Sequence, residues 1–209
     1  MNEPETVAAL LTRYGTTYAE EAGITLRDTP APLYRLLVLT VLCSVRISAD
    51  IATAAARELH AAGIDTPRRM AEADRSVLIA AFARAHYVRY DESTATALTK
   101  GASLLLDRWH GDLRRLRDEA GGESGRIGEL LTEFPRIGPV GSAIFRREAQ
   151  AVWLSLRPFF DERTRAEARL LGLPDNPSAL AALADPARLA AALTRASLAH
   201  VGAAGLGAD

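Results

Sequence analysis

The stretch from Phe134 to Asp161 contains the two patterns in this sequence that are best suited to chemistry. The first, Phe134-Pro135-Arg136-Ile137-Gly138-Pro139, is a turn rich in glycine and proline that leads into a helical pattern. A helix that begins after such a turn has backbone N–H groups without a carbonyl partner, and these groups can hold a phosphate. The second pattern is a lone acid, Asp161, just before the predicted helix Glu162–Leu171.

Each pattern also has a purely structural explanation. A turn with glycine and proline often only joins two helices, and an aspartate before a helix is a common N-cap. Gly172 and then Pro174 end the predicted helix after Asp161 in the usual way. The residues alone therefore leave both explanations open, although the two patterns together at this separation are uncommon.

The segments that would position these residues are almost all helical. Leu33–Val45 is apolar nearly all round and is predicted to be a buried core helix rather than a membrane span. Strand-like alternation occurs only at Val152, Leu154 and Leu156, where we expect irregular structure. Typical helix starts, with a small polar residue or an acid before the first turn, occur at Asn2, Ser48, Thr66, Asp74, Asn176 and Asp185. The sequence therefore predicts an all-α fold.

Composition narrows the class of protein. The chain has 209 residues, enough for one domain or two small ones, and a formal net charge of −1. Its single cysteine, Cys43, excludes a disulfide framework and a cysteine-ligated iron–sulfur cluster, and it favours a reducing compartment. The histidines have no ligand spacing, and no signal peptide or membrane-spanning run is evident. We expect a cytoplasmic protein without a metal, a cofactor or a membrane partner.

These landmarks resemble, in order, those of the endonuclease III-like (HhH-GPD) superfamily of DNA glycosylases. Leu131–Ala143 resembles the helix-hairpin-helix of that family. Phe159-Phe160-Asp161, followed by Arg169-Leu170-Leu171-Gly172-Leu173-Pro174, resembles its catalytic-aspartate segment. Leu42-Cys43-Ser44-Val45-Arg46-Ile47-Ser48 is similar to a stretch that begins a helix facing the DNA. The resemblance extends over roughly residues 5–175.

The resemblance implies two helical modules with a DNA-binding cleft between them. Residues 30–149 would form a helical barrel module that includes the hairpin. Residues 1–29 together with 150–209 would form a second module that carries the catalytic aspartate. We expect a monomer that acts on double-stranded DNA.

The resemblance also implies roles for individual residues. Asp161 would be the catalytic carboxylate, stabilising positive charge on the deoxyribose and orienting water, although Glu162 beside it complicates this assignment. Arg46 would fill the space left by a flipped base, or it is simply an exposed arginine at a helix end. The hairpin residues expected to contact DNA are Arg136, Ile137, Gly138, Val140, Gly141 and Ser142.

Three aromatic residues are candidates for stacking on an extruded base: Tyr87, Tyr90 and Trp109. For Trp109 we favour core packing, because it lies at helical spacing from Leu105. Tyr87 and Tyr90 are therefore the predicted base-pocket residues.

The sequence departs from the family pattern at several positions. Many relatives carry an iron–sulfur cluster, which one cysteine cannot bind. Bifunctional members have a lysine where this chain has Val140, and the only lysine here is Lys100. Arg136 replaces a usual glycine, and Gly141-Ser142 replaces a usual Thr-Ala pair. A sequence pI near 6.4 gives little electrostatic support for binding to DNA, although seven arginines lie between Arg136 and Arg169.

These observations lead to one main hypothesis and two alternatives. The main hypothesis is a monofunctional DNA glycosylase that hydrolyses the N-glycosidic bond of a damaged or mispaired base, with alkylated purines as the expected substrates. The first alternative is a non-catalytic helix-hairpin-helix protein that binds DNA or recognises damage. The second is a structural helical protein without a role on DNA.

Overall fold

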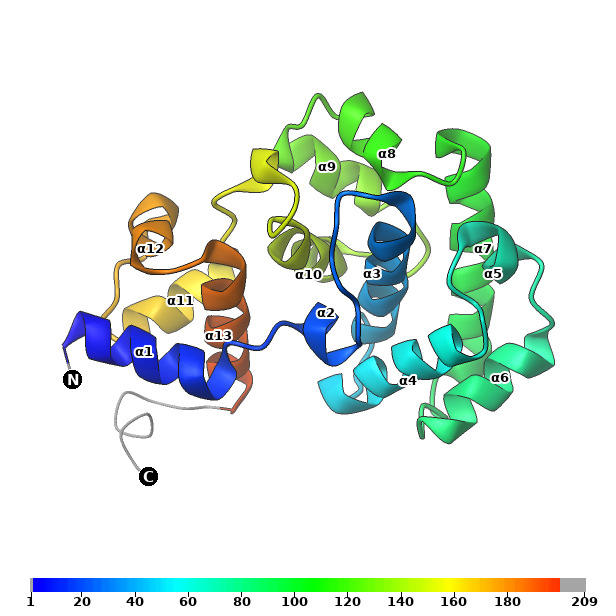
Figure 1. Ribbon diagram of the computed structural model, residues 1–209, viewed down its shortest axis with the longest axis horizontal. Coiled ribbons are helices and arrows are strands. Elements are labelled where there is room, and N and C mark those ends of the chain that lie inside the picture. Colours follow the sequence, from blue (N-terminus) through cyan, green and yellow to red (C-terminus); the bar gives the residue numbers. More distant parts are fainter. Residues whose placement is uncertain (1, 200–209) are drawn as a thin grey trace. The chain divides into compact units, whose positions relative to one another are not determined.

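The computed structural model describes residues 2–199, and every regular element in this range is a helix (Figure 1). The all-α prediction is therefore confirmed for the described residues. The strand-like alternation at Val152, Leu154 and Leu156 does not produce a strand. Instead, a short 3₁₀ helix, η1, spans Leu154–Leu156.

The helices group into two compact units. One contains residues 19–146, and the other contains the described parts of residues 1–18 and 147–209. The chain passes from one unit to the other within the short helix α2 (Tyr18–Glu21) and within α10 (Pro139–Ala149). The sequence predicted different boundaries for the two modules, between residues 29 and 30 and between residues 149 and 150.

The unit of residues 19–146 is organised around two long helices. α3 contacts α4, α7 and α8, while α7 also contacts α5 and α6. Nine of the fourteen residues of α3 are buried, which confirms the predicted core helix. The helices of this unit before α10 are α3 (Pro30–Cys43), α4 (Ala49–Ala61), α5 (Pro67–Ala71), α6 (Arg75–Arg84), α7 (Asp91–Trp109), α8 (Leu113–Glu119) and α9 (Ser124–Leu131).

The turn between α9 and α10 is anchored by aromatic packing. Phe134 is buried and stacks on Trp109 of α7, with 5.6 Å between the ring centroids. The Trp109 indole also donates a hydrogen bond of 2.7 Å to Glu119. Trp109 is therefore a core residue, as its spacing from Leu105 predicted, and it fixes the start of the turn.

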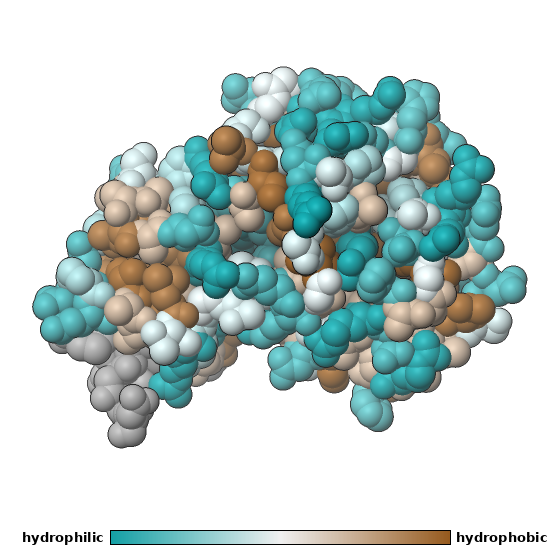
Figure 2. Space-filling model, viewed as in Figure 1, coloured by the Kyte–Doolittle hydropathy of each residue, from teal (hydrophilic) through white to brown (hydrophobic). Residues whose placement is uncertain are grey.

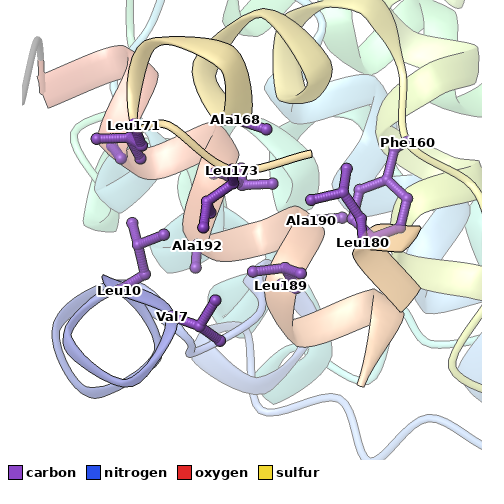
Figure 3. Packing of buried hydrophobic residues seen from close by; sticks show 12 residues of the cluster. Val7, Leu10, Phe160, Ala168, Leu171, Leu173, Leu180, Leu189, Ala190 and Ala192 are labelled. Atoms are coloured by element: carbon purple, nitrogen blue, oxygen red, sulfur yellow. The ribbon is translucent and has the colours of Figure 1, made fainter. Parts of the chain in front are cut away.

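The second unit is built around α13 (Pro186–Ala199), which contacts α1, α11 and α12. Val7 and Leu10 of α1 lie over one side of its core, and Leu189, Ala190 and Ala192 of α13 supply another side (Figure 3). The other helices of this unit are α1 (Glu3–Tyr14), α11 (Glu162–Leu170) and α12 (Pro177–Leu183).

The predicted helix starts agree with the observed caps. Asn2 and Glu5 form a reciprocal capping box at α1, in which each side chain accepts a hydrogen bond from the backbone of the other residue. The Ser48 side chain caps α4, and Asn176 precedes a proline at the start of α12. Local capping chemistry was therefore readable in the sequence.

The visible surface differs between the units. Hydrophilic side chains dominate the face of the unit of residues 19–146 in Figure 2, whereas hydrophobic side chains gather over α12 in the other unit. Within residues 2–199, no helix is both long enough and apolar enough to cross a membrane.

Gly141, in the first turn of α10, lies against the end of α3. A Cβ atom at this position would come within 2.5 Å of the Ser44 Oγ atom and 3.3 Å of the Ile137 side chain. The Ser44 hydroxyl is held in place, because it donates a hydrogen bond of 2.6 Å to the Thr40 carbonyl. The absence of a side chain at residue 141 therefore allows the start of α10 to approach the end of α3.

We expect Gly141→Ala to lower the free energy of unfolding by about 1–3 kcal/mol, the usual effect of overpacking. This loss should outweigh the better helix propensity of alanine, which amounts to about 1 kcal/mol. Gly138→Ala is the matched control, because a Cβ there would meet no atom within 4 Å. Urea unfolding of both variants would measure the difference.

Adding Ser44→Ala to Gly141→Ala should recover most of the lost stability, because it removes the atom with which the new methyl group collides. If Gly141→Ala unfolds at the same urea concentration as the wild type, residue 141 is not in close contact with Ser44 in solution.

Candidate functional site

Asp161 is the N-cap of α11, as the structural explanation of the sequence pattern predicted. Its Oδ1 atom accepts a hydrogen bond of 3.0 Å from the Thr164 N–H group. In the same turn, the Thr164 hydroxyl donates a hydrogen bond of 2.8 Å to the Asp161 carbonyl. One carboxylate oxygen therefore has a clear structural role.

The second carboxylate oxygen of Asp161 forms an ion pair with Arg147 near the C-terminal end of α10. The pair is largely buried, since the side chain of Arg147 is 7% exposed and that of Asp161 is 17% exposed. A buried guanidinium that loses its carboxylate partner is left with an uncompensated charge, which is strongly unfavourable. Asp161 is therefore more than a helix cap in this structure.

The chain just before Asp161 is also fixed. The Gln150 side chain donates to the Phe159 carbonyl and accepts from the Phe159 N–H group, both at 2.9 Å. The Arg157 guanidinium donates a hydrogen bond of 2.6 Å to the Gln150 carbonyl. Phe160 is buried beside Leu180, as Figure 3 shows. The backbone on both sides of Asp161 is thus held by specific contacts.

Arg147 and Gln150 were not among the site residues predicted from the sequence. They lie three residues apart, with Arg147 in the last turn of α10 and Gln150 immediately after its last residue, Ala149. Two polar residues at this spacing near the end of a helix were a detectable signal. Their partners, Phe159 and Asp161, could not be identified from the sequence. The chain follows an irregular path between α10 and α11 before these two residues come back into contact with Gln150 and Arg147.

Two other carboxylates near Asp161 have different surroundings. Glu162 is exposed and pairs with Arg169 at 2.8 Å and with Arg165 at 3.6 Å. The hydrogen bond from Arg169, followed by its positive charge, lowers the pKa of Glu162. Glu148 is buried and accepts a hydrogen bond of 3.3 Å from the Tyr18 N–H group. Of the three, only Asp161 combines a partly exposed carboxylate with an ion pair to a buried arginine.

The turn before α10 presents part of the predicted DNA-contact set to solvent. Gly138 and Val140 are exposed, whereas Ile137, Gly141 and Ser142 are buried. The Ser142 hydroxyl donates a hydrogen bond of 3.0 Å to the Gly128 carbonyl and so ties α10 to α9. Val140 and Gly141 lie in the first turn of α10, where a helix supplies no carbonyl for their N–H groups. Backbone N–H groups rather than side chains are thus the candidate phosphate donors here.

Arg136 adopts a left-handed backbone conformation, with φ of +70°. Its guanidinium donates hydrogen bonds to the Ser93 hydroxyl (2.6 Å) and the Thr94 hydroxyl (3.2 Å) at the start of α7, and lies 5.8 Å from the Tyr90 ring centroid. A glycine would adopt this backbone conformation without strain. The side-chain contacts therefore stabilise a conformation that is unfavourable for arginine.

The predicted base-pocket tyrosines differ in accessibility. Tyr87 is 0% exposed, packs on Phe82, and shares a hydrogen bond of 3.1 Å with Thr94. Burial raises the pKa of Tyr87, against smaller opposing effects of the Thr94 hydrogen bond and the Arg136 charge. Tyr87 is thus a core residue with no ring face open to a base. Tyr90 is partly exposed, and the guanidinium groups of Arg89 and Arg136 lie 5.2 Å and 5.8 Å from its ring centroid.

Arg46 is exposed in the turn between α3 and α4. This turn begins with Ser44, whose Oγ atom lies against Gly141. The structure therefore brings the turn that carries Arg46 next to the start of α10, although the two segments are almost a hundred residues apart in the sequence.

Most of the arginines between residues 136 and 169 already have partners within the chain. Arg146 donates to Ser142 and Ser124, Arg165 donates to the Asp175 carbonyl, and Arg169 pairs with Glu162 and Asp175. Because an ion pair with a carboxylate offsets the charge of a guanidinium, as at Arg147 and Arg169, counting arginines in the sequence overstates the positive charge available to DNA. Among the described residues, no group of three histidine, cysteine, aspartate or glutamate side chains is arranged to hold a metal ion.

We expect Arg136→Ala to be less stable than Arg136→Gly by about 1 kcal/mol. Both substitutions remove the hydrogen bonds to Ser93 and Thr94, but only glycine relieves the left-handed backbone conformation. The difference in unfolding free energy between the two variants isolates the backbone strain. Equal stability would mean that residue 136 is not held in this conformation in solution.

The comparisons with known proteins add no family assignment. No model of a known protein family matches the chain, and no curated protein matches it significantly.

Proposed function

We propose that this protein is a monofunctional DNA glycosylase, which removes a damaged base, alkylated purines in particular, or a mispaired base from double-stranded DNA by hydrolysis. Such a reaction begins base excision repair. The observation that carries the proposal is the state of Asp161, whose carboxylate is fixed at both oxygens yet remains partly exposed.

The chemistry of glycosidic cleavage suits a carboxylate of this kind. Positive charge develops on the deoxyribose as the base leaves, and a fixed negative group nearby stabilises it without having to reorganise. A carboxylate has about four lone-pair sites, of which the Thr164 N–H and Arg147 each occupy one. The remaining sites are available to orient water or to face the sugar.

The turn before α10 supports binding to phosphate. Gly138 and Val140 are exposed, and the N-terminal end of α10 has both unpaired N–H groups and the positive end of the helix dipole. The turn with the exposed Arg46 lies beside this helix start and supplies a cation. Contacts of this type position DNA without reading its sequence.

The proposal excludes a lyase step that uses a lysine of the hairpin. A Schiff base requires an amine, and Val140 stands where bifunctional relatives have lysine. Lys100, the only lysine of the chain, belongs to α7. The product should therefore be an intact abasic site.

One observation favours a second candidate, a non-catalytic protein that recognises damaged DNA. The Arg147 guanidinium offsets the negative charge of Asp161, which reduces what this carboxylate can contribute to catalysis. A protein of this kind would use the turn and α10 to bind DNA and would have retained Asp161 for stability.

We expect Asp161→Asn to slow base release by about a hundredfold or more, because an amide cannot replace the negative charge. The measurement is single-turnover release from a methylated duplex, with duplex affinity determined in parallel. Asp185→Asn is the matched control, because Asp185 also caps a helix, accepting the Ala187 and Arg188 N–H groups, and also pairs with an arginine, Arg157. This control should keep the wild-type rate.

Both variants should melt at a lower temperature, since each loses an ion pair. The larger decrease is expected for Asp161→Asn, because its arginine is buried. If Asp161→Asn releases bases at the wild-type rate, Asp161 is only a helix cap. Glu148 and Glu162 are then the next candidates for the catalytic carboxylate. A wild-type protein that prefers damaged duplex over undamaged duplex but releases no base from a panel of modified duplexes would support the second candidate.

We also expect base release without strand cleavage. Borohydride should trap no covalent protein–DNA complex, and the product should break only after treatment with alkali. The lysine-free variant Lys100→Arg sharpens the assay, because its N-terminal amine is then the only amine left. A trapped complex that disappears in Lys100→Arg would identify a lysine-dependent lyase and contradict the monofunctional assignment.

A further inference from the structure

We propose that Arg147, assisted by Gln150, is the positioning residue for Asp161 and sets the orientation of its carboxylate. This inference rests on the proposed function, in which Asp161 is the catalytic group. It adds a specific role for the C-terminal end of α10, which the sequence patterns did not suggest.

The first support is the contrast between Asp161 and the other aspartates that cap helices in the described part of the chain. Asp112 pairs with Arg114, which is only two residues away and has a side chain 37% exposed, and Asp185 pairs with the exposed Arg157 at 3.5 Å. Asp74 makes no capping hydrogen bond with its side chain. Helix caps in this protein therefore do not need a buried arginine, and the one at Asp161 requires another explanation.

The second support is the high desolvation penalty of a buried guanidinium. Arg147 is 7% exposed and comes from a helix fourteen residues before its partner. Buried ion pairs often contribute little to net stability compared with apolar residues of similar size, but they impose a unique geometry. An arginine in this place is consistent with selection for the orientation of the carboxylate.

The third support is that the end of α10 and the residue that follows it fix the whole segment. Arg147 contacts the Asp161 side chain, while Gln150, the first residue after α10, pairs with both backbone groups of Phe159. Phe159 and Asp161 are thus both held by residues at or just beyond the C-terminal end of α10. A catalytic group held in this way is preorganised, so no free energy is needed to align it during the reaction.

The test compares Arg147→Met, Arg147→Lys and the control Arg146→Met in single-turnover base release at saturating protein. Arg147→Met should slow the rate by roughly a hundredfold, the effect expected when a reacting group is misplaced by about 1 Å. Duplex affinity should be unchanged, because Arg147 is buried. Arg147→Lys keeps the charge and should restore most of the rate.

Arg146→Met removes the neighbouring arginine of the same helix, whose hydrogen bonds go to Ser142 and Ser124 rather than to Asp161. It should keep the wild-type rate. All variants are to be assayed well below their melting temperatures, so that unfolding does not contribute to any loss of rate. In the Asp161→Asn background, Arg147→Met should produce no further loss, because Arg147 acts through Asp161.

The outcomes separate this inference from the proposed function. A wild-type protein without base release on any modified duplex overturns both. An active wild type with Arg147→Met equally active, or faster, overturns only the positioning role, and a faster variant would show that Arg147 masks the carboxylate. A parallel loss of rate and duplex affinity would instead make Arg147 a DNA contact.

Discussion

A buried guanidinium needs an anionic partner, and Arg147 has one in Asp161. This requirement accounts for much of the local structure around it. The chain leaves α10, passes through η1, and returns so that Phe159 meets Gln150 and Phe160 enters the core of the unit. The start of α11 is then defined by Asp161, which serves as a cap through one oxygen and as an ion-pair partner through the other. Loss of the ion pair would leave a buried charge, so the loop has little freedom to adopt another path.

The same pair also limits the chemistry that is available at Asp161. An arginine in contact with a carboxylate reduces its net negative field, but it also fixes the direction in which the remaining lone pairs point. A glycosylase reaction with a good leaving group, such as a base made cationic by alkylation, needs charge stabilisation more than proton transfer to the base. A fixed carboxylate with a partly compensated charge is compatible with that requirement.

The start of α10 depends on a different constraint, which is close packing. Gly141 allows the helix to approach Ser44, and this approach brings the turn that carries the exposed Arg46 next to the start of α10. Arg136 adopts a backbone conformation that favours glycine, and its hydrogen bonds to Ser93 and Thr94 compensate for this. The departures at these two positions from the pattern of the family that the sequence resembles therefore have local structural explanations. They do not by themselves argue for or against binding to DNA.

The sequence by itself determined the helical class, most helix starts and the buried character of α3. These features depend on periodicity and on capping groups that act within three or four residues, so neighbouring residues suffice to specify them. The role of Asp161 as a cap was predictable for the same reason, and so was the packing of Trp109. The proposed roles of Asp161 and of the turn before α10 in binding and cleaving DNA substrates stay predictions.

Only the tertiary structure decided which side chains meet across longer separations. It placed Arg147 against Asp161 and Gln150 against Phe159, and it buried Tyr87, which was a predicted base-pocket residue. It also paired most arginines between residues 136 and 169 with groups of the same chain. Burial and ion pairing depend on how the chain returns on itself in space, and a spacing pattern along the sequence contains no information about that path.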